Sequence, residues 1–167
     1  MANYLGMSTY TENLSCSGEY RNAVKCQAPA TGTLINLQVL IISDAGGNAK
    51  LALYADNAGV PGALLVDAGS VALSNGWNII GGLSLPITLN TYYWIGFHME
   101  SAAPSVAYNI STNNRAYQAG SYENAFANPF GTPDGYNEYC WCLRGEIAEA
   151  GGLSIPVAMD IYRQRRN

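Results

Sequence analysis

Apolar residues recur with a period of two across residues 49–99, and this pattern constrains the fold more than any other feature of the chain. They form short runs separated by Gly, Pro, Asn and Asp. Successive side chains of a strand point to opposite faces, so such runs are typical of half-buried antiparallel strands. The pattern predicts an all-β protein, built as an antiparallel two-sheet sandwich.

Turn-forming residues separate the expected strands. The segment 56–62 contains Asp56, Asn57, Gly59, Pro61 and Gly62, residues that tolerate or fix the backbone angles of turns. We therefore expect a turn there and a new strand starting near residue 63. At residues 75–76 the Asn-Gly pair is the signal of a type I′ turn, so we expect a β-hairpin around it.

Other segments also have the alternation or the β-rich composition of strands. We expect them at residues 4–10, 19–27, 33–42, 92–99 and 138–147. In residues 33–42 the inward face should consist of Ile35, Leu37, Val39 and Ile41, with Asn36 and Gln38 on the other face. Residues 92–99 are apolar on both faces, which favours the middle of a sheet. Residues 138–147 should pair near the N-terminal strand.

The chain has 167 residues, which suits one domain with a substantial core. We expect a single β-sandwich domain over residues 1–150 and a C-terminal arm over residues 151–167. In the arm, alternate residues are apolar and would share one face of an extra strand: Leu153, Ile155, Val157, Met159 and Ile161. A basic end follows, with Arg163, Arg165 and Arg166. A strand with such a stripe can add to the sheet of a neighbouring copy, so we expect a homo-oligomer.

Charge excludes one class of partner. The formal net charge is -4 and the isoelectric point is near 4.8, which argues against a nucleic-acid binder, because such proteins use Lys and Arg to neutralise phosphates. No run of about 18 apolar residues is present, so we expect no membrane span. The first ten residues have neither the basic nor the apolar region of a Sec signal peptide.

Four cysteines raise the question of disulfides: Cys16, Cys26, Cys140 and Cys142. Cys140 and Cys142 should lie on the same face of one strand, about 7 Å apart by strand rise, too far for an unstrained bond between them. Cross-strand bonds from Cys16 or Cys26 to them stay open, as does the alternative that all four are free thiols. Their spacing lacks the paired pattern of a zinc site.

Catalytic chemistry has little support in the sequence. His98 is the single histidine, and its place in an expected central strand favours a packed or hydrogen-bonded structural role. No nucleophile-elbow, phosphate-binding or zinc-protease motif occurs. Asp56, Asn57 and Asp67 could supply oxygen ligands for Ca²⁺, but turn formation alone explains the first two. We therefore expect no enzyme activity and no cofactor.

Aromatic residues crowd the polar segment 101–139. Tyr117, Tyr122 and Tyr136 are candidates for a recognition loop, because exposed tyrosines can stack on sugar rings or form a protein contact. Packing of the loop on itself is the alternative, particularly for Phe126 and Phe130.

Three stretches together carry a family resemblance. They are ALYADNAGVPGALL at residues 52–65, GWN at 76–78, and residues 89–97, which end in YWIGF. The region 20–147 resembles small jelly-roll-type β-sandwich modules of bacterial and archaeal surface proteins and of phage virion proteins, often described as carbohydrate-binding-like. The resemblance implies a jelly-roll fold and carries no catalytic residues. Residues 151–167 depart from the family pattern.

Two functions follow as hypotheses. One is a structural or assembly protein of a virion surface, such as a capsid decoration, head-fibre or tail-fibre component that forms a homo-oligomer or joins a capsid lattice. The other is a carbohydrate-binding module that recognises a cell-surface glycan through its aromatic loops. In both cases we expect the protein on a virion or on the outside of a cell.

Overall fold

The computed structural model describes residues 2–43, 46–100 and 104–149, and this part of the chain is all-β, as predicted. The strands are β1 (Asn3–Gly6), β2 (Glu12–Ser15), β3 (Tyr20–Gln27), β4 (Gly32–Ser43), β5 (Asn48–Asn57), β6 (Val60–Ala72), β7 (Gly76–Ile87), β8 (Tyr92–Met99), β9 (Ser105–Ala119), β10 (Gly135–Trp141) and β11 (Leu143–Glu149). In the described part, no helix is long and apolar enough to cross a membrane.

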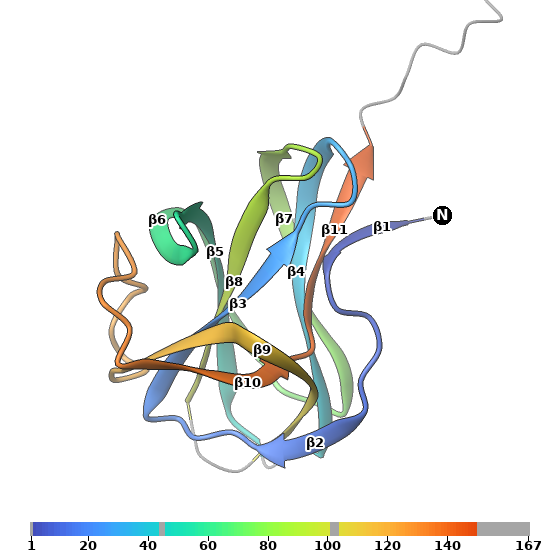
Figure 1. Cartoon of the computed structure of the whole chain (residues 1–167). Coiled ribbons are helices and arrows are strands. Elements are labelled where there is room, and N and C mark those ends of the chain that lie inside the picture. The colour runs from blue at the N-terminus through green and yellow to red at the C-terminus, as the bar shows by residue number, and fades with distance from the viewer. Residues whose placement is uncertain (1, 44–45, 101–103, 150–167) are drawn as a thin grey trace, which may run out of the picture.

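The strands form one antiparallel sheet that curls into a half-barrel (Figure 1). The hydrogen-bonded path runs β1-β11-β4-β9-β3-β8-β5-β6, with β7 paired to β4, and β2 and β10 paired to β9. The antiparallel all-β class is confirmed. A division into two jelly-roll sheets is not, because β4 and β9 are joined by the pairs Ile41–Val106 and Ser43–Ser105. The extra C-terminal strand lies outside the described residues.

The concave side of the sheet encloses the main core. Side chains from strands that face each other across the curl fill it, among them Leu37 and Val39 of β4, Leu53 of β5, Ile95 of β8 and Ile147 of β11. Removing such a side chain from water contributes about 1.5–3 kcal/mol. The core is therefore the main source of stability for the half-barrel.

Strand β8 lies in the middle of the sheet, between β3 and β5, as its two apolar faces predict. Every residue from Tyr93 to Met99 is buried. At Gly96 the backbone runs against the neighbouring strand, and an added Cβ would lie 2.9 Å from the Tyr54 ring. A side chain at this position would displace Tyr54.

The inward face of β4 differs from the prediction at its start. Leu37, Val39 and Ile41 are buried in the core as expected, but Ile35 is only half-buried and Leu34 takes the core position. The cause is a bulge in β4: Asn36 pairs with Glu146 of β11 and Leu34 pairs with the next residue, Ile147, so Ile35 is the extra residue on β4. A bulge adds one residue to a strand and so exchanges the two faces beyond it.

One predicted turn is confirmed and one predicted hairpin is wrong. Ala58 and Gly59 both have positive φ and join Asn57 to Val60 in a two-residue turn, three residues before the expected start of the next strand. At residues 75–76 the chain does turn, but no hairpin forms there. β6 pairs with β5 and β7 pairs with β4. The side chain of Asn78 organises this crossing by bonding backbone groups of Ser74 and Gly76.

The expected strand at residues 138–147 is divided into β10 and β11 by a break at Cys142. β11 pairs with β1, so the prediction that this segment lies near the N-terminal strand is confirmed. The break also corrects the cysteine prediction. Cys140 is in the main core, whereas Cys142 packs with Leu40 and Ala107 in a separate cluster.

Candidate functional site

The aromatic segment between β9 and β10 covers the convex face of the sheet. Phe126 and Phe130 are buried there and pack edge-to-face on Tyr54, with ring centroids 6.2 and 5.2 Å away. Trp94 of β8 belongs to the same cluster. These two phenylalanines therefore pack against their own sheet and are not available to a ligand. The segment therefore covers the face of β8 that carries Trp94.

The same segment seals the edge strand β6. The backbone N–H of Phe130 donates to the Gly62 carbonyl at 3.0 Å, and the Leu64 N–H donates to Asn128 Oδ1 at 3.0 Å. Unpaired edge groups are templates for adding a further strand. On β6 two of these groups, the Gly62 carbonyl and the Leu64 N–H, are hydrogen-bonded within the same chain.

The three tyrosines predicted for recognition do not lie at one site. Tyr117, on β9, contacts the Tyr20 ring edge-to-face at 5.7 Å. Tyr122 packs against the buried His98, and the Lys50 ammonium lies 4.3 Å from its ring centroid. Tyr136, on β10, is 36% exposed. Only Tyr136 has the exposure expected of a binding aromatic side chain.

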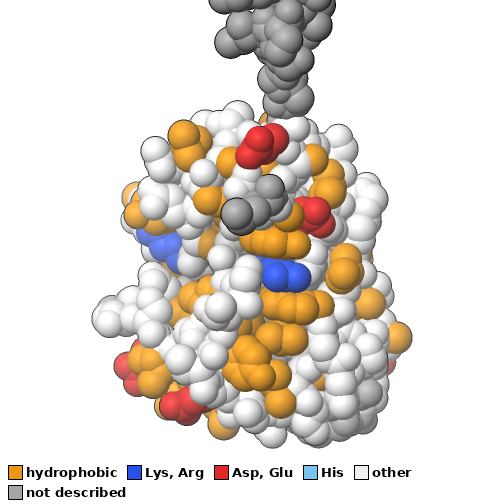
Figure 2. All heavy atoms as spheres, turned by 90° about the vertical axis from the view of Figure 1, so that its right-hand side faces the viewer, with side chains coloured by type: hydrophobic (Ala, Val, Ile, Leu, Met, Phe, Trp, Pro, Cys, Tyr) orange, Lys and Arg blue, Asp and Glu red, His pale blue; other side chains and the backbone are white. Residues whose placement is uncertain are grey.

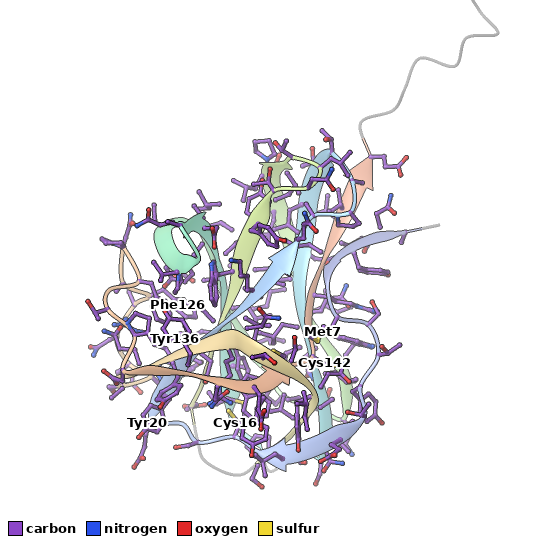
Figure 3. The ribbon with its side chains drawn as sticks, in the orientation of Figure 1. Met7, Cys16, Tyr20, Phe126, Tyr136 and Cys142 are labelled. Atoms are coloured by element: carbon purple, nitrogen blue, oxygen red, sulfur yellow. The ribbon has the colours of Figure 1, made fainter. Side chains whose placement is uncertain are left out.

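A cavity of about 470 Å³ adjoins Tyr136. Its lining includes three prolines, Pro61, Pro129 and Pro133, together with Asn57 at the end of β5. Figure 3 labels Phe126, in the segment between β9 and β10, close to Tyr136 of β10. Rigid prolines beside an exposed tyrosine form an apolar surface that needs little reorganisation to receive a flat ligand.

His98 is buried, and its Nε2 atom lies 3.0 Å from the carbonyl oxygen of Gly18, to which the ring donates. Burial is the main cause that lowers the pKa of His98 below 6.5, and the nearby charges of Lys50 and Arg21 act in the same direction. The imidazole has the packed, hydrogen-bonded position that the sequence predicts.

The residues considered for calcium serve turns. Asp56 accepts hydrogen bonds from the Trp94 indole at 2.7 Å and from the Gly59 backbone at 3.0 Å, and it pairs with Lys25 at 3.3 Å. These bonds lower the pKa of Asp56, although burial opposes them. Asp67 accepts from the Gly69 N–H at 2.9 Å. Within the described ranges, no three His, Cys, Asp or Glu side chains are grouped to hold a metal ion.

All four cysteines are free thiols, so of the two alternatives left open by the sequence, cross-strand disulfides or free thiols, the structure has the free thiols. Burial raises the pKa of Cys16 to about 12 and that of Cys140 and Cys142 to about 11, and it also raises the pKa of Cys26. Thiols with raised pKa values are poor nucleophiles at neutral pH.

A second surface lies on the outward face of β1, β11, β4 and β7, and we call it the β11 face; it comprises Tyr4, Arg144, Gln38, Trp77 and Ile79. The guanidinium carbon of Arg144 lies between two aromatic rings, 4.1 Å from the Tyr4 centroid and 3.8 Å from the Trp77 centroid. Its Nε donates to Gln38 at 2.8 Å. Ile79, opposite Gln38 in the ladder, is 53% exposed. Figure 2 shows this side of the molecule, with hydrophobic side chains gathered around a basic one.

A smaller cavity of about 260 Å³ was not anticipated from the sequence. It lies where β2, β3, β9 and β10 meet, and Arg115, Tyr139 and Trp141 contribute to its lining. Cys16 and Tyr20, also in the lining, lie on the chain that runs from β2 to β3 beneath β9 and β10 (Figure 3). No sequence motif marks it, because the residues come from four separated strands.

The apolar and basic residues of the predicted C-terminal strand, from Leu153 to Arg166, lie outside the described residues. No protein-family model matches the chain, and a search of curated proteins finds no match either.

Proposed function

We propose that this protein is a non-enzymatic structural or assembly protein, a virion surface component of the capsid decoration, head-fibre or tail-fibre type. In this proposal residues 153–161 add to a neighbouring copy and join the subunits into a homo-oligomer. The observation that carries the proposal is the β11 face. It presents the exposed Ile79, with the partly buried rings of Tyr4 and Trp77, near the strand that leads into residues 150–167.

Strand addition needs an edge as well as an apolar face. β1 is the last strand of the hydrogen-bonded path, and among the described strands it pairs with β11 alone. Its outer edge can therefore offer main-chain groups to an added strand. The segment 153–161 would gain these hydrogen bonds and bury its apolar stripe at the same time.

Charge complements this arrangement. Glu146 and Glu149 lie on β11, where Glu146 accepts from Asn36 at 2.9 Å and Glu149 accepts from Asn3. The arginines at 163, 165 and 166 follow the apolar stripe of the arm. Opposite charges at the rim of an interface favour the correct register more than they add affinity.

Paired substitutions in the arm test the proposal. Ile155→Asp with Met159→Asp places two charges on the apolar stripe, whereas Ser154→Asp with Ala158→Asp places two charges on the opposite face. We expect the first pair to convert the oligomer to monomers in sedimentation velocity and the second to leave it assembled. Equal masses for the two variants would refute the strand-addition interface.

The virion assignment and the jelly-roll family assignment rest on the resemblance of residues 20–147. A negative-stain image of the purified protein tests the assembly class directly. We expect rings, fibres or ordered particles, and isolated monomers at high concentration would contradict an assembly role.

The second candidate is a carbohydrate-binding module, which is favoured by the exposed position of Tyr136 beside the proline-lined cavity. Its test is a glycan array probed with the full chain, with Tyr136→Ala and with Tyr10→Ala as the control, since Tyr10 is also exposed but lies outside that cavity. Loss of a glycan signal in the first variant alone supports the module. The absence of any glycan signal with the full chain argues against it.

A further inference from the structure

Arg115 lines the small cavity without a counter-ion. In the part of the chain that the structure describes, Lys25 and Asp56 form the one ion pair, so Arg115 has no carboxylate partner there. Its ionisable neighbours include Cys16 and Cys140, whose thiols remain neutral at pH 7 because burial raises their pKa values. Buried charges in proteins are normally paired, so an unpaired guanidinium is an unusual feature.

Two donors in the lining have no acceptor. The Nε atom of Arg115 and the Nε1 atom of Trp141 are both buried and make no hydrogen bond. The Trp141 side chain is only 2% exposed, so the protein bears the desolvation cost of its indole N–H without a partner. Both residues line the same cavity, and both lack an acceptor.

Aromatic rings surround the guanidinium. Its carbon lies 5.0 Å from the centroid of Trp141 and 5.6 Å from that of Tyr117. Tyr20 and Tyr139 add two further rings to the lining, and Tyr20 is partly exposed. Aromatic walls with polar tips favour a ligand that has both apolar C–H faces and hydroxyl groups.

The break in the β9–β10 ladder leaves space at this point. Asn137 pairs with Arg115, but the next pair is Tyr139 with Ile110, so the pairing passes over residues 111–114 of β9. Irregularities of this kind often lie next to binding sites, because they re-aim side chains out of the regular pleat. The resulting volume, about 260 Å³, is just below the range of about 300–1,000 Å³ for drug-sized ligands and suits a single sugar residue.

We infer that this cavity binds the carboxylate of an acidic sugar, a uronic acid residue, with Arg115 and the Trp141 indole N–H as donors and the aromatic rings against the sugar. Arginine is the side chain best suited to carboxylates, because its planar fork forms two parallel charge-assisted hydrogen bonds. The inference extends the second candidate function to a defined ligand class and a different site. It does not depend on self-association.

Isothermal titration calorimetry of the full chain tests it, with D-glucuronate, its neutral counterpart methyl β-D-glucoside, and acetate as ligands. We expect saturable binding of glucuronate that is at least about tenfold tighter than binding of either other compound, because only glucuronate offers both carboxylate and ring. No saturable binding of glucuronate would overturn the inference. Acetate binding as tight as glucuronate binding would overturn the assignment to a sugar.

Two variants locate the site. Arg115→Met should abolish glucuronate binding and lower the melting temperature of the free protein by only a few degrees, because the loss of the cation–π contacts with Trp141 and Tyr117 is partly offset by the removal of a charge that has no carboxylate partner among the described residues. Arg21→Met is the matched control, because Arg21 bonds Gln118 outside the cavity. Unchanged binding in Arg115→Met would refute the site.

If Arg115→Met does not fold, Trp141→Phe answers the same question. It keeps an aromatic wall but removes the indole N–H and part of the buried ring, so we expect glucuronate binding to weaken by about three- to tenfold and the melting temperature to fall by a few degrees. Wild-type affinity in this variant would contradict the role of the indole N–H. Sedimentation of the same samples reports assembly separately, so failure of the proposed assembly role would not be mistaken for failure of this site.

Discussion

Arg144 lies against Trp77 on the β11 face, with its guanidinium carbon 3.8 Å from the centroid of the indole ring. Because Tyr4 lies 4.1 Å away on the opposite side, the charge of Arg144 is held within an aromatic surface instead of extending into water. The arrangement links β1, β11 and β7 through one side chain. Side chains held by such contacts lose less conformational entropy when a strand docks on them.

Removing this link should weaken the fold moderately. Arg144→Ala loses two cation–π contacts and the hydrogen bond to Gln38, so we expect the free energy of unfolding to fall by about 1–3 kcal/mol. Urea denaturation followed by tryptophan fluorescence measures the change. A variant as stable as the wild type would show that these contacts make no net contribution to the free energy of unfolding.

Phe130 and Tyr136 should respond differently to truncation although they belong to neighbouring parts of the chain. Phe130 is fully buried against Tyr54, so Phe130→Ala should cost about 3–5 kcal/mol of unfolding free energy. Tyr136 is partly exposed, and Tyr136→Ala should cost less than about 1 kcal/mol. Thermal denaturation of both variants distinguishes packing from recognition. Similar losses in the two would contradict the roles assigned to them.

Stability should decline in mild acid because of His98. Its pKa in the folded state is lowered below 6.5, so below pH 6.5 the unfolded chain binds a proton more readily than the native protein does. The contribution of His98 is therefore complete above pH 6.5 and is lost as the pH falls toward its lowered value. We expect urea midpoints to decrease over this range in the wild type. His98→Gln should remove that part of the pH dependence, and an identical slope in both proteins would refute the assignment.

Asn78 should be important for the crossing between β6 and β7. Its buried amide forms bonds with Ser74 and Gly76, and Asn78→Ala leaves those backbone groups unpaired, at a cost of about 1–3 kcal/mol. Asn124→Ala is a suitable control because Asn124 is exposed and bonds through its backbone. Denaturant midpoints compare the two, and a neutral Asn78→Ala would show that the turn forms without its side chain.

Local patterns predicted the strands well and their partners less well. Residues 92–99 are apolar on both faces, and this local pattern correctly predicted that β8 lies in the middle of the sheet. The bulge after Leu34 could not be predicted from residues 33–42, since the inserted residue is defined by the pairing with β11. The Asn-Gly signal at 75–76 correctly predicted a change of direction but not its type, since Gly76 has positive φ and Asn75 does not have the positive φ of a type I′ turn. It could not show that β7 pairs with β4, because pairing over long range depends on the whole sheet.

The candidate sites were the least predictable part. The sequence indicated an aromatic recognition segment, yet Phe126 and Phe130 are used to cover Trp94 and Tyr54. Their burial depends on the shape of a sheet face formed by distant strands. Arg115 and Trp141 gave no signal at all, since neither belongs to a motif and their shared cavity exists only after β9 and β10 pair around a break.

Self-association through the C-terminal arm is the central claim, and deletion of residues 151–167 tests it most directly. The mass in solution of the full chain and of the truncated chain would be measured by light scattering coupled to size-exclusion chromatography, with circular dichroism to confirm that both fold. We predict an oligomer for the full chain and a folded monomer for the truncated one. An oligomer of unchanged size after the deletion would contradict the claim.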